Sequence, residues 1–517
     1  MEDVRGKIGD LQAALAASEA ARRAAEAMVT HLRLIIAKMR HDRYGASSER
    51  GKRLLDQLEL ELEDLETGMA EDDPANGPGT AIPVTDPGPQ RHAGRRPLPS
   101  DLPRERVVIP APTQCPYCGS ARLTKLGESI TETLEVIPRQ FRVIQTVREK
   151  FSCRDCETIT QPPAPFHPLV RGRAGPHLLA SVLVGKFADH QPLNRQAAAF
   201  AREGIALDTS TLADWVGACT ATLAPLTTLI KEHVLAGERV HADDTTVPVL
   251  ASSRTVTGRL WTYVRDDRPF GGPAPPAAWF GYSRDHRGEH PTTHLDGWSG
   301  IVQADAYAGY NALAKPGRQP APVTLAGCWA HARRGLFRLA ELGRAPLAVE
   351  AVHRIDCLFE VERTINGVVP QQRAALRQQF SAPIVENLME WMRDSCSRMS
   401  GKSPVAQAMA YILRRQDTFT AFLHDGRICL TNNAAERSLR GIAVGRKAWL
   451  FAGSDRGGRR AAAMYSLIVT AKLNDVDPHA WLADVIGRIN DIPLSRLPDL
   501  LPWNWKNTRH ANHTQAA

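Results

Sequence analysis

The stretch RVHADDTTVPVL, residues 239–250, places the strongest constraint on how this chain folds. Its valines and threonines are β-branched, and its apolar residues are typical of a buried β-strand. Two adjacent acids, Asp243 and Asp244, nevertheless stand in the middle of it. Because an unpaired buried carboxylate is costly, the pattern indicates that at least one of these acids has a function beyond the packing of a core strand.

Four further runs downstream are typical of strands. They are GRLWTYVRD (258–266), AAWFGYSRD (277–285), SGIVQADAYAGYN (299–311) and PVTLAGCW (322–329). With the opening run they predict an α/β sheet in which three strands, a short helix, a fourth strand, a helix and a fifth strand follow in order. Asp305 ends the fourth of these strands. Where the first and fourth strands are neighbours, Asp243 and Asp305 face each other, and a divalent cation is the usual counter-charge.

A third acid is expected near this pair, and the segment TNNAAERSLR supplies it as Glu436. One of residues 431–433 can cap a helix that carries Glu436 in its first turns. Between residues 437 and 460, seven Lys or Arg residues stand against one acid, which suits a site where metal ions meet a phosphodiester. The alternative is a surface helix on which Glu436 pairs with Arg440, four residues further on.

The N-terminal region, residues 1–68, has apolar residues at alternating steps of four and three, before residue 40 and again after residue 54. This heptad pattern predicts a coiled coil of the leucine-zipper type, and with it a homo-oligomer. An amphipathic helix that packs on its own chain is the alternative. Residues 69–111 are rich in Pro and Gly and have no apolar period, which predicts a flexible linker.

Four cysteines predict a small zinc-ribbon-like module over residues 112–160. They form two C-x2-C pairs, and the segment between the pairs alternates as strands do. Four thiolates can bind one tetrahedral Zn²⁺ and leave no position for water, so the role of this ion would be structural. A redox pair or spare thiols is the alternative. The cysteines are Cys115, Cys118, Cys153 and Cys156.

The remainder of the chain divides into four parts. Residues 170–236 are helical, with two short helices across a glycine turn, which suits a helix-turn-helix DNA-binding region or a plain helical subdomain. Residues 237–460 contain the sheet and a helical insertion at about 340–425. A C-terminal helical segment is expected at 461–505 and a disordered tail at 506–517.

Charge and hydropathy bound the class of protein. The net charge of +8 permits nucleic-acid binding and is equally compatible with a basic surface that binds none. The first residues lack the apolar segment of a signal peptide, and no apolar run reaches the roughly 18 residues of a membrane span. We therefore expect a cytoplasmic protein without a membrane partner.

Six motifs stand out along the chain: HADDT, GIVQADAYAGYN, GCWAHARR, TNNAAERSLR, GRKAWLFAGS and YSLIVTAKLNDVDPHAWLADVI. In this order the chain resembles the transposases of the insertion-sequence-sixty-six family over nearly its whole length. The resemblance implies an α/β catalytic core with a ribonuclease-H-like mixed sheet, a bacterial and nucleoid-associated location, and DNA as the partner. It also implies divalent-metal-dependent cleavage at the transposon ends and transfer of the freed 3′-OH into target DNA, with companion proteins of the same element.

By that resemblance, Asp243, Asp305 and Glu436 form a catalytic triad that binds two Mg²⁺ or Mn²⁺ ions. Strand alternation points Asp243 and Asp244 to opposite faces, and the family match selects Asp243. The basic residues expected to contact DNA phosphates are Arg437, Arg440, Arg446 and Lys447. The residues expected to support the site are His241, Asp244, His331 and Asn433.

Two of the supporting roles have alternatives. His241 either steadies Asp243 by hydrogen bonding or is a satisfied core histidine. His331 is expected to have an orienting or packing role; the alternative is ligation, because Cys328 and His331 have the C-x2-H spacing of half a metal site. The function as a whole has two alternatives: a nuclease of the same fold that only hydrolyses, and a zinc-module DNA-binding protein whose core does not catalyse.

Overall fold

The computed structural model describes residues 140–152, 159–160, 166–167, 169, 172, 174–252, 254–341, 345–449 and 451–515. The chain divides into two compact units, one of residues 77–164 and one of residues 1–76 and 165–517. The predicted coiled coil, the linker and the four zinc-module cysteines lie outside the described residues. In the smaller unit, β1 (Phe151–Ser152) pairs antiparallel with β2 (Ile159–Thr160).

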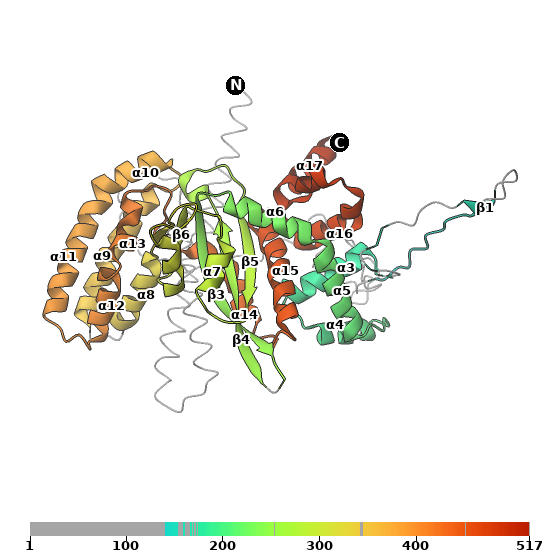
Figure 1. The fold of residues 1–517 in the computed structure, drawn as a ribbon, viewed down its shortest axis with the longest axis horizontal. Helices are drawn as coiled ribbons and strands as arrows, with labels where there is room; N and C mark the ends of the chain where they lie inside the picture. The colour runs from blue at the N-terminus through green and yellow to red at the C-terminus, as the bar shows by residue number, and fades with distance from the viewer. Residues whose placement is uncertain are drawn as a thin grey trace, which may run out of the picture. The chain divides into compact units, whose positions relative to one another are not determined.

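A five-stranded mixed sheet forms the centre of the larger unit (Figure 1). Its strands lie in the order β5-β4-β3-β6-β7; the first three pair antiparallel, and β6 and β7 add in parallel to β3. The predicted mixed α/β sheet is therefore confirmed, with the first and fourth predicted strands as neighbours. The bounds are β3 (Arg239–Leu250), β4 (Thr255–Arg265), β5 (Ala277–Ser283), β6 (Ile301–Gln303) and β7 (Thr324–Ala326).

The connections between strands differ in part from the expected order. The short helix before β6 is α7 (Glu289–His294), as expected. Between β6 and β7, however, the predicted helix is the 3₁₀ segment η3 (Ala308–Ala314), because the sequence there is short of the apolar period that an α-helix needs. A further 3₁₀ turn, η2 (Arg268–Phe270), lies between β4 and β5.

The helices before the sheet belong to the same hydrophobic core as the sheet. Two of them are joined across Gly204, whose φ of +82° explains why glycine stands at that turn. Leu183, Leu212 and Ile230 are fully buried in one core with Trp261 of β4, so this region packs as part of the larger unit. The helices are α3 (Pro176–Phe187), α4 (Leu193–Arg202), α5 (Thr209–Thr222) and α6 (Ala224–Leu235).

Helix α15 (Asp455–Leu473) packs along the edge of the sheet that β5 forms. Ser466 Oγ accepts the Phe280 N–H at 2.8 Å, and Thr470 Oγ1 accepts the Ala278 N–H at 3.1 Å, so the helix satisfies two outer backbone donors of β5. The boundary expected between residues 237–460 and 461–505 therefore falls inside α15, and this helix packs in the same hydrophobic core as the sheet.

The C-terminal residues also differ from the expected disordered tail. Residues 506–515 continue helix α17 (Pro502–Gln515). Its first turn is anchored, because buried Trp505 donates to Asp484 at 2.7 Å and Lys506 donates to the Asn474 carbonyl at 3.0 Å. Before α17 come α16 (Pro478–Arg488), η6 (Ile489–Asp491) and η7 (Leu494–Leu500).

A helical region with a core of its own lies beside β7, on the side of the sheet away from α3 and α16 (Figure 1). Trp329, Phe419 and Phe422 are buried in it, and Glu362 forms ion pairs with buried Arg373 and Arg377. Its elements are α8 (Trp329–Ala340), α9 (Pro346–Thr364), α10 (Pro370–Leu376), the π-helix η4 (Arg377–Ser381), α11 (Ala382–Ser397), α12 (Pro404–Leu413), α13 (Gln416–Thr420) and η5 (Ala421–Leu423).

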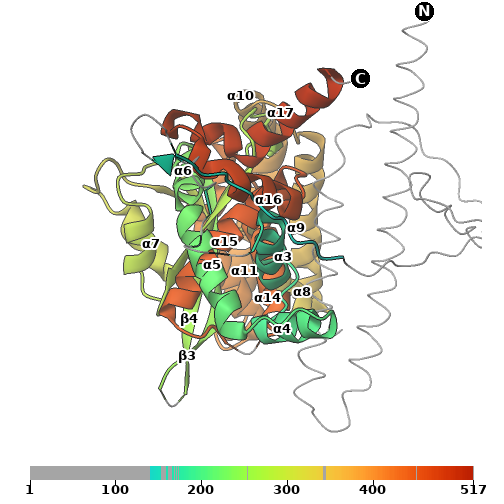
Figure 2. The same ribbon diagram turned by 90° about the vertical axis from the view of Figure 1, so that its right-hand side faces the viewer.

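The last element of the site is α14 (Asn433–Gly445), which returns from this helical region to pack on β3 and β4. Figure 2 shows α14 and α15 near the sheet and α7 projecting at another side of the molecule. Within the described part of the chain, no helix is both long and apolar enough to cross a membrane.

Candidate active site

The first two acids of the predicted triad come together at the centre of the sheet. Strand β3 pairs in parallel with β6, with Arg239 opposite Ile301 and His241 opposite Gln303. Continued by two residues, this register sets Asp305 opposite Asp243. Asp305 lies just past the end of β6, and its Oδ1 accepts the Tyr307 N–H at 3.1 Å. Asp243 Oδ1 accepts the Asp244 N–H at 2.7 Å.

Glu436 joins this pair from the first turn of α14. Desolvation, followed by the charges of Glu436 and Asp305, raises the pKa of Asp243 well above its usual range. Glu436 Oε2 accepts a hydrogen bond from Arg334 of α8 at 3.1 Å, so its described ion-pair partner comes from another helix, not from the same one. A desolvated carboxylate on which the charges of two further carboxylates act fits a divalent cation, whose charge offsets their repulsion and whose preferred ligands are carboxylate oxygens.

Asp244 faces the other side of the sheet. Its Oδ2 accepts from Arg259 of β4 at 2.7 Å, and its Oδ1 lies 2.9 Å from His286 Nε2. Alternation along β3 thus separates the two adjacent acids, one toward α14 and one toward the turn after β5.

Asn432 connects the helix of Glu436 to the strand of Asp243. It is buried, its Oδ1 lies 3.1 Å from His241 Nδ1, and its Nδ2 donates to the Ala242 carbonyl at 2.9 Å. Asn432 occupies the N-cap position of α14, but its side chain makes no capping bond, because the strand uses both of its polar ends. The described side-chain contacts of His241 are to Asn432 and Arg239, which is the arrangement of a satisfied core histidine. Asn432 is therefore the asparagine whose described hydrogen bonds join α14 to β3, whereas the sequence analysis named the adjacent Asn433 as a supporting residue.

Cys328 has a structural role in the described contacts. Its Sγ accepts the His331 N–H at 3.4 Å, which caps α8, and the Asn432 N–H at 3.3 Å. Burial raises the pKa of the Cys328 thiol to about 12, which disfavours the thiolate that a metal requires. His331 lies where the charges of Asp305 and Glu436 act on its imidazole, although desolvation lowers its pKa overall. Its place beside the acids fits the orienting role better than half of a Cys/His metal site.

The four basic residues after Glu436 differ in their surroundings. Arg446 is half-buried and donates to Thr245 Oγ1 at 3.1 Å and to the Thr246 carbonyl at 2.7 Å. It therefore ties the end of α14 to β3, which is a structural role. Arg437 and Lys447 are exposed, and Arg440 is half-buried.

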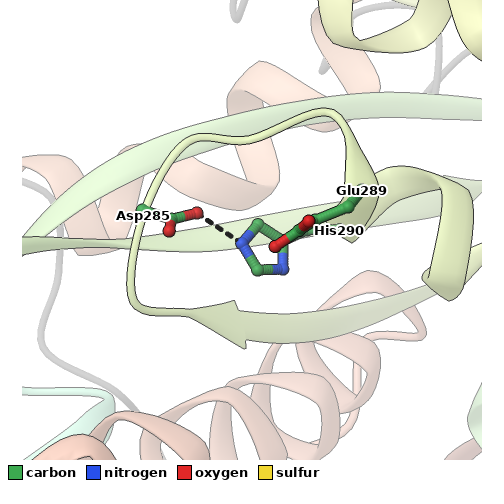
Figure 3. Close-up of side chains that lie close together, drawn as sticks. All are labelled: Asp285, Glu289 and His290. Atoms are coloured by element: carbon green, nitrogen blue, oxygen red, sulfur yellow. Dashed lines mark hydrogen bonds and ion pairs between the residues drawn. The ribbon is translucent and has the colours of Figure 1, made fainter.

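A second group of metal-ligand types, which sequence reasoning missed, lies where the turn after β5 meets the first turn of α7 (Figure 3). The ligand atoms of Asp285, Glu289 and His290 all lie within 4.8 Å of one another. Asp285 Oδ1 is 2.6 Å from His290 Nε2 and also accepts the Arg287 N–H at 3.2 Å. These bonds close the turn on itself. The spacing of the three residues in DHRGEH was the signal available in the sequence.

Comparison with family models covers most of the chain. Residues 171–460 match "Transposase IS66 family", and residues 466–503 match "IS66 C-terminal element". Residues 31–107 match "Transposase C of IS166 homeodomain", and residues 112–157 match "zinc-finger binding domain of transposase IS66". The class that these parts define is a transposase-type enzyme with a zinc-finger module.

Two relatives from Sinorhizobium fredii (strain NBRC 101917 / NGR234), both named as uncharacterized proteins, match along the chain. The protein y4hP is 51% identical over 502 residues, which span 95% of this chain and 91% of the relative. The protein y4qI is 36% identical over 507 residues, which span 95% of this chain and 93% of the relative. The chain belongs to the IS66 family of transposases.

Proposed function

We propose that this protein cleaves DNA at the ends of a bacterial insertion sequence and transfers the freed 3′-OH into target DNA at the site formed by Asp243, Asp305 and Glu436. The observation that carries the proposal is the placement of Glu436 on α14 and of Asp305 just past β6 near Asp243 of β3, whose pKa is raised well above its usual range by desolvation and then by the charges of these two acids. Acids that converge in this way favour metal-assisted phosphoryl transfer.

The sheet supports a ribonuclease-H-like core. Three antiparallel strands are followed by two parallel ones, in the order β5-β4-β3-β6-β7. The first acid stands on the central strand, the second at the end of its parallel neighbour, and the third on a helix that packs against them. This is the arrangement that the family resemblance leads one to expect of an Asp-Asp-Glu transposase.

The residues perform separate parts of the reaction in this proposal. Two divalent ions, Mg²⁺ or Mn²⁺, would supply charge for the attacking and leaving oxygens when bound. Asp243 would hold a cation through its carboxylate, whose pKa desolvation and then the charges of Glu436 and Asp305 raise well above its usual range. Asp305 and Glu436, which accepts a hydrogen bond from Arg334 in the structure, would be the other carboxylates that hold the cations. No covalent protein–DNA intermediate is needed, since the nucleophiles are water and then the DNA 3′-OH.

Other parts of the chain would bind and arrange the DNA. Helices α4 and α5 are candidates for recognition of the terminal repeats, together with a zinc module held by Cys115, Cys118, Cys153 and Cys156. Exposed Arg437 and Lys447 are candidates for phosphate contacts, whereas Arg440 and Arg446 stand closer to the protein interior. The N-terminal zipper would bring copies of the chain together, and companion proteins of the element would complete the assembly.

A nicking assay tests the proposal. Purified protein is incubated with end-labelled transposon-end DNA, Mg²⁺ and the companion proteins, beside the Asp243→Asn and Asp244→Asn variants. We expect nicking by the wild type and, at saturating Mg²⁺, by Asp244→Asn, and none by Asp243→Asn. Nicking without strand transfer would favour the hydrolytic nuclease, and DNA binding without nicking by any of the three proteins would favour the non-catalytic DNA-binding protein.

A further inference from the structure

The second carboxylate of the site is not fixed by the sheet. The last ladder pair of β6 with β3 joins His241 and Gln303, two residues before Asp305. The direction of the Asp305 side chain therefore depends on the turn that follows. Within the described residues, the hydrogen bond that fixes it comes from the Tyr307 N–H to Oδ1, at 3.1 Å.

Tyr307 is in turn clamped by His286, from the turn after β5. The two rings stack with centroids 4.0 Å apart and an interplanar angle of 14°. The Tyr307 hydroxyl donates to the His286 backbone carbonyl. Tyr310 packs edge-on against Tyr307 at 5.7 Å, so the ring has little freedom to rotate.

His286 is itself oriented by Asp244. Its Nε2 lies 2.9 Å from Asp244 Oδ1, while Arg259 holds the other carboxylate oxygen at 2.7 Å. The turn that carries His286 is closed by the bond between Asp285 and His290 (Figure 3). It is also tied to β4, because Ser283 Oγ accepts from Trp261 Nε1 at 2.8 Å and donates to the Asp285 carbonyl at 2.6 Å.

These contacts form a chain of residues that connects Asp243 to Asp305 through side chains on the opposite face of the sheet. Asp244 donates its backbone N–H to Asp243, and its side chain holds His286, which stacks on Tyr307, which holds Asp305. Partners that orient metal ligands matter almost as much as the ligands themselves, and changing them typically costs about 10- to 100-fold in metal affinity or activity.

We propose that Asp244, His286 and Tyr307 are positioning residues that hold Asp305 in the orientation required for divalent-metal binding. This inference rests on the proposed function of the three-acid site. It gives the two adjacent acids of β3 different functions. Asp243 binds the cation, and Asp244 positions Asp305, the ligand that follows β6.

Mn²⁺ binding to the full-length, zinc-loaded protein without DNA tests the inference by isothermal titration and electron paramagnetic resonance. His286→Gln keeps a donor for Asp244 but has no ring to stack on Tyr307. Tyr307→Ala removes the ring, and Tyr307→Phe keeps the ring and the backbone N–H. His353→Ala, at an exposed histidine of α9, is the matched control.

We expect His286→Gln and Tyr307→Ala to weaken Mn²⁺ binding about 10-fold, with recovery toward the wild-type value in Tyr307→Phe and no change in His353→Ala. Nicking by the weakened variants should return as Mn²⁺ is raised, since the ligands themselves remain. Thermal unfolding of each variant is measured alongside. Wild-type Mn²⁺ affinity in both His286→Gln and Tyr307→Ala overturns the inference, whether or not the variants unfold at a lower temperature.

The same titration separates this inference from the function on which it rests. If the wild type binds no Mn²⁺, or if Asp243→Asn binds it as the wild type does, the three-acid site is wrong. If Asp243→Asn loses binding while His286→Gln and Tyr307→Ala retain it in full, the site stands and the positioning role is wrong.

Discussion

Replacement of Asn432 by alanine should damage both the stability and the activity of the protein. Asn432 is buried and joins α14, which carries Glu436, to β3, which carries Asp243. Its Oδ1 contacts His241 Nδ1 at 3.1 Å, and its Nδ2 donates to the Ala242 carbonyl at 2.9 Å. Alanine removes both contacts and leaves two buried polar groups without these partners.

The magnitude follows from the two groups left behind. A buried polar group that loses its partner costs about 1–3 kcal/mol, so the variant should lose about 3 kcal/mol of stability. For a chain of this size that corresponds to a fall of roughly 3 °C in unfolding temperature. Because Asn432 contacts the residues next to Asp243 on β3, the rate of nicking should also fall, by at least about 10-fold, at temperatures well below the unfolding transition.

Differential scanning fluorimetry and the nicking assay measure the two effects on the same preparations. Asn474→Ala is the matched control, since half-buried Asn474 also makes two hydrogen bonds, to the Pro276 carbonyl at 2.8 Å and the Thr470 carbonyl at 2.9 Å, but lies at the end of α15. It should lose stability and keep its nicking rate. An Asn432→Ala variant that unfolds like the wild type, or that loses stability yet nicks at the wild-type rate, would refute the reasoning.

Three further predictions concern other parts of the chain. Desolvation, helped by the charges of Lys231 and His290, lowers the pKa of His294 to about 4. As the pH falls, the unfolded chain, with an imidazole pKa of about 6.5, therefore takes up a proton before the folded protein does. Between pH 7 and pH 5 this group should cost about 2 kcal/mol of stability. Urea unfolding at the two pH values should show a smaller loss of stability in His294→Gln than in the wild type. Glu362→Ala leaves the buried guanidinium groups of Arg373 and Arg377 without their carboxylate. The helical region should therefore lose about 3–5 kcal/mol of stability. Circular dichroism should show a lower melting temperature, and an unchanged melting temperature would contradict this prediction. Serine at any of the four zinc-module cysteines should remove one equivalent of zinc per chain, measured by zinc release, and retention of zinc would contradict the four-thiolate site.

The sheet could be predicted from the sequence because its strands carry strong local signals. Five of the twelve residues in the run 239–250 are β-branched Val or Thr, and β3 has the same bounds in the structure. The segment 299–311 was expected to contain a strand that ends in a carboxylate, and β6 ends two residues before Asp305. Neighbouring first and fourth strands then follow from the acids themselves, since each carboxylate alone would be costly to bury.

The contacts around the acids could not be predicted, because they depend on residues far apart in the chain. Asn432 and Asn433 are indistinguishable in TNNAAERSLR, and the choice between them depends on which side chain reaches His241, nearly two hundred residues earlier. Arg446 looked available for phosphate, but only the packing of α14 on β3 brings it to Thr246. The helix in the expected tail could not be predicted for the same reason, since Lys506 reaches the Asn474 carbonyl only once the chain has folded.

The central claim is that the metal site is the group of Asp243, Asp305 and Glu436. The group of Asp285, Glu289 and His290 provides the control, because it also contains residues that could bind a metal ion. The most direct measurement compares Glu436→Gln with Glu289→Gln in the nicking assay, over a range of Mg²⁺ and with companion proteins supplied. Both changes replace a carboxylate by an amide of the same shape. Loss of nicking in Glu436→Gln with wild-type nicking in Glu289→Gln is the predicted result, and the reverse pattern would contradict the account.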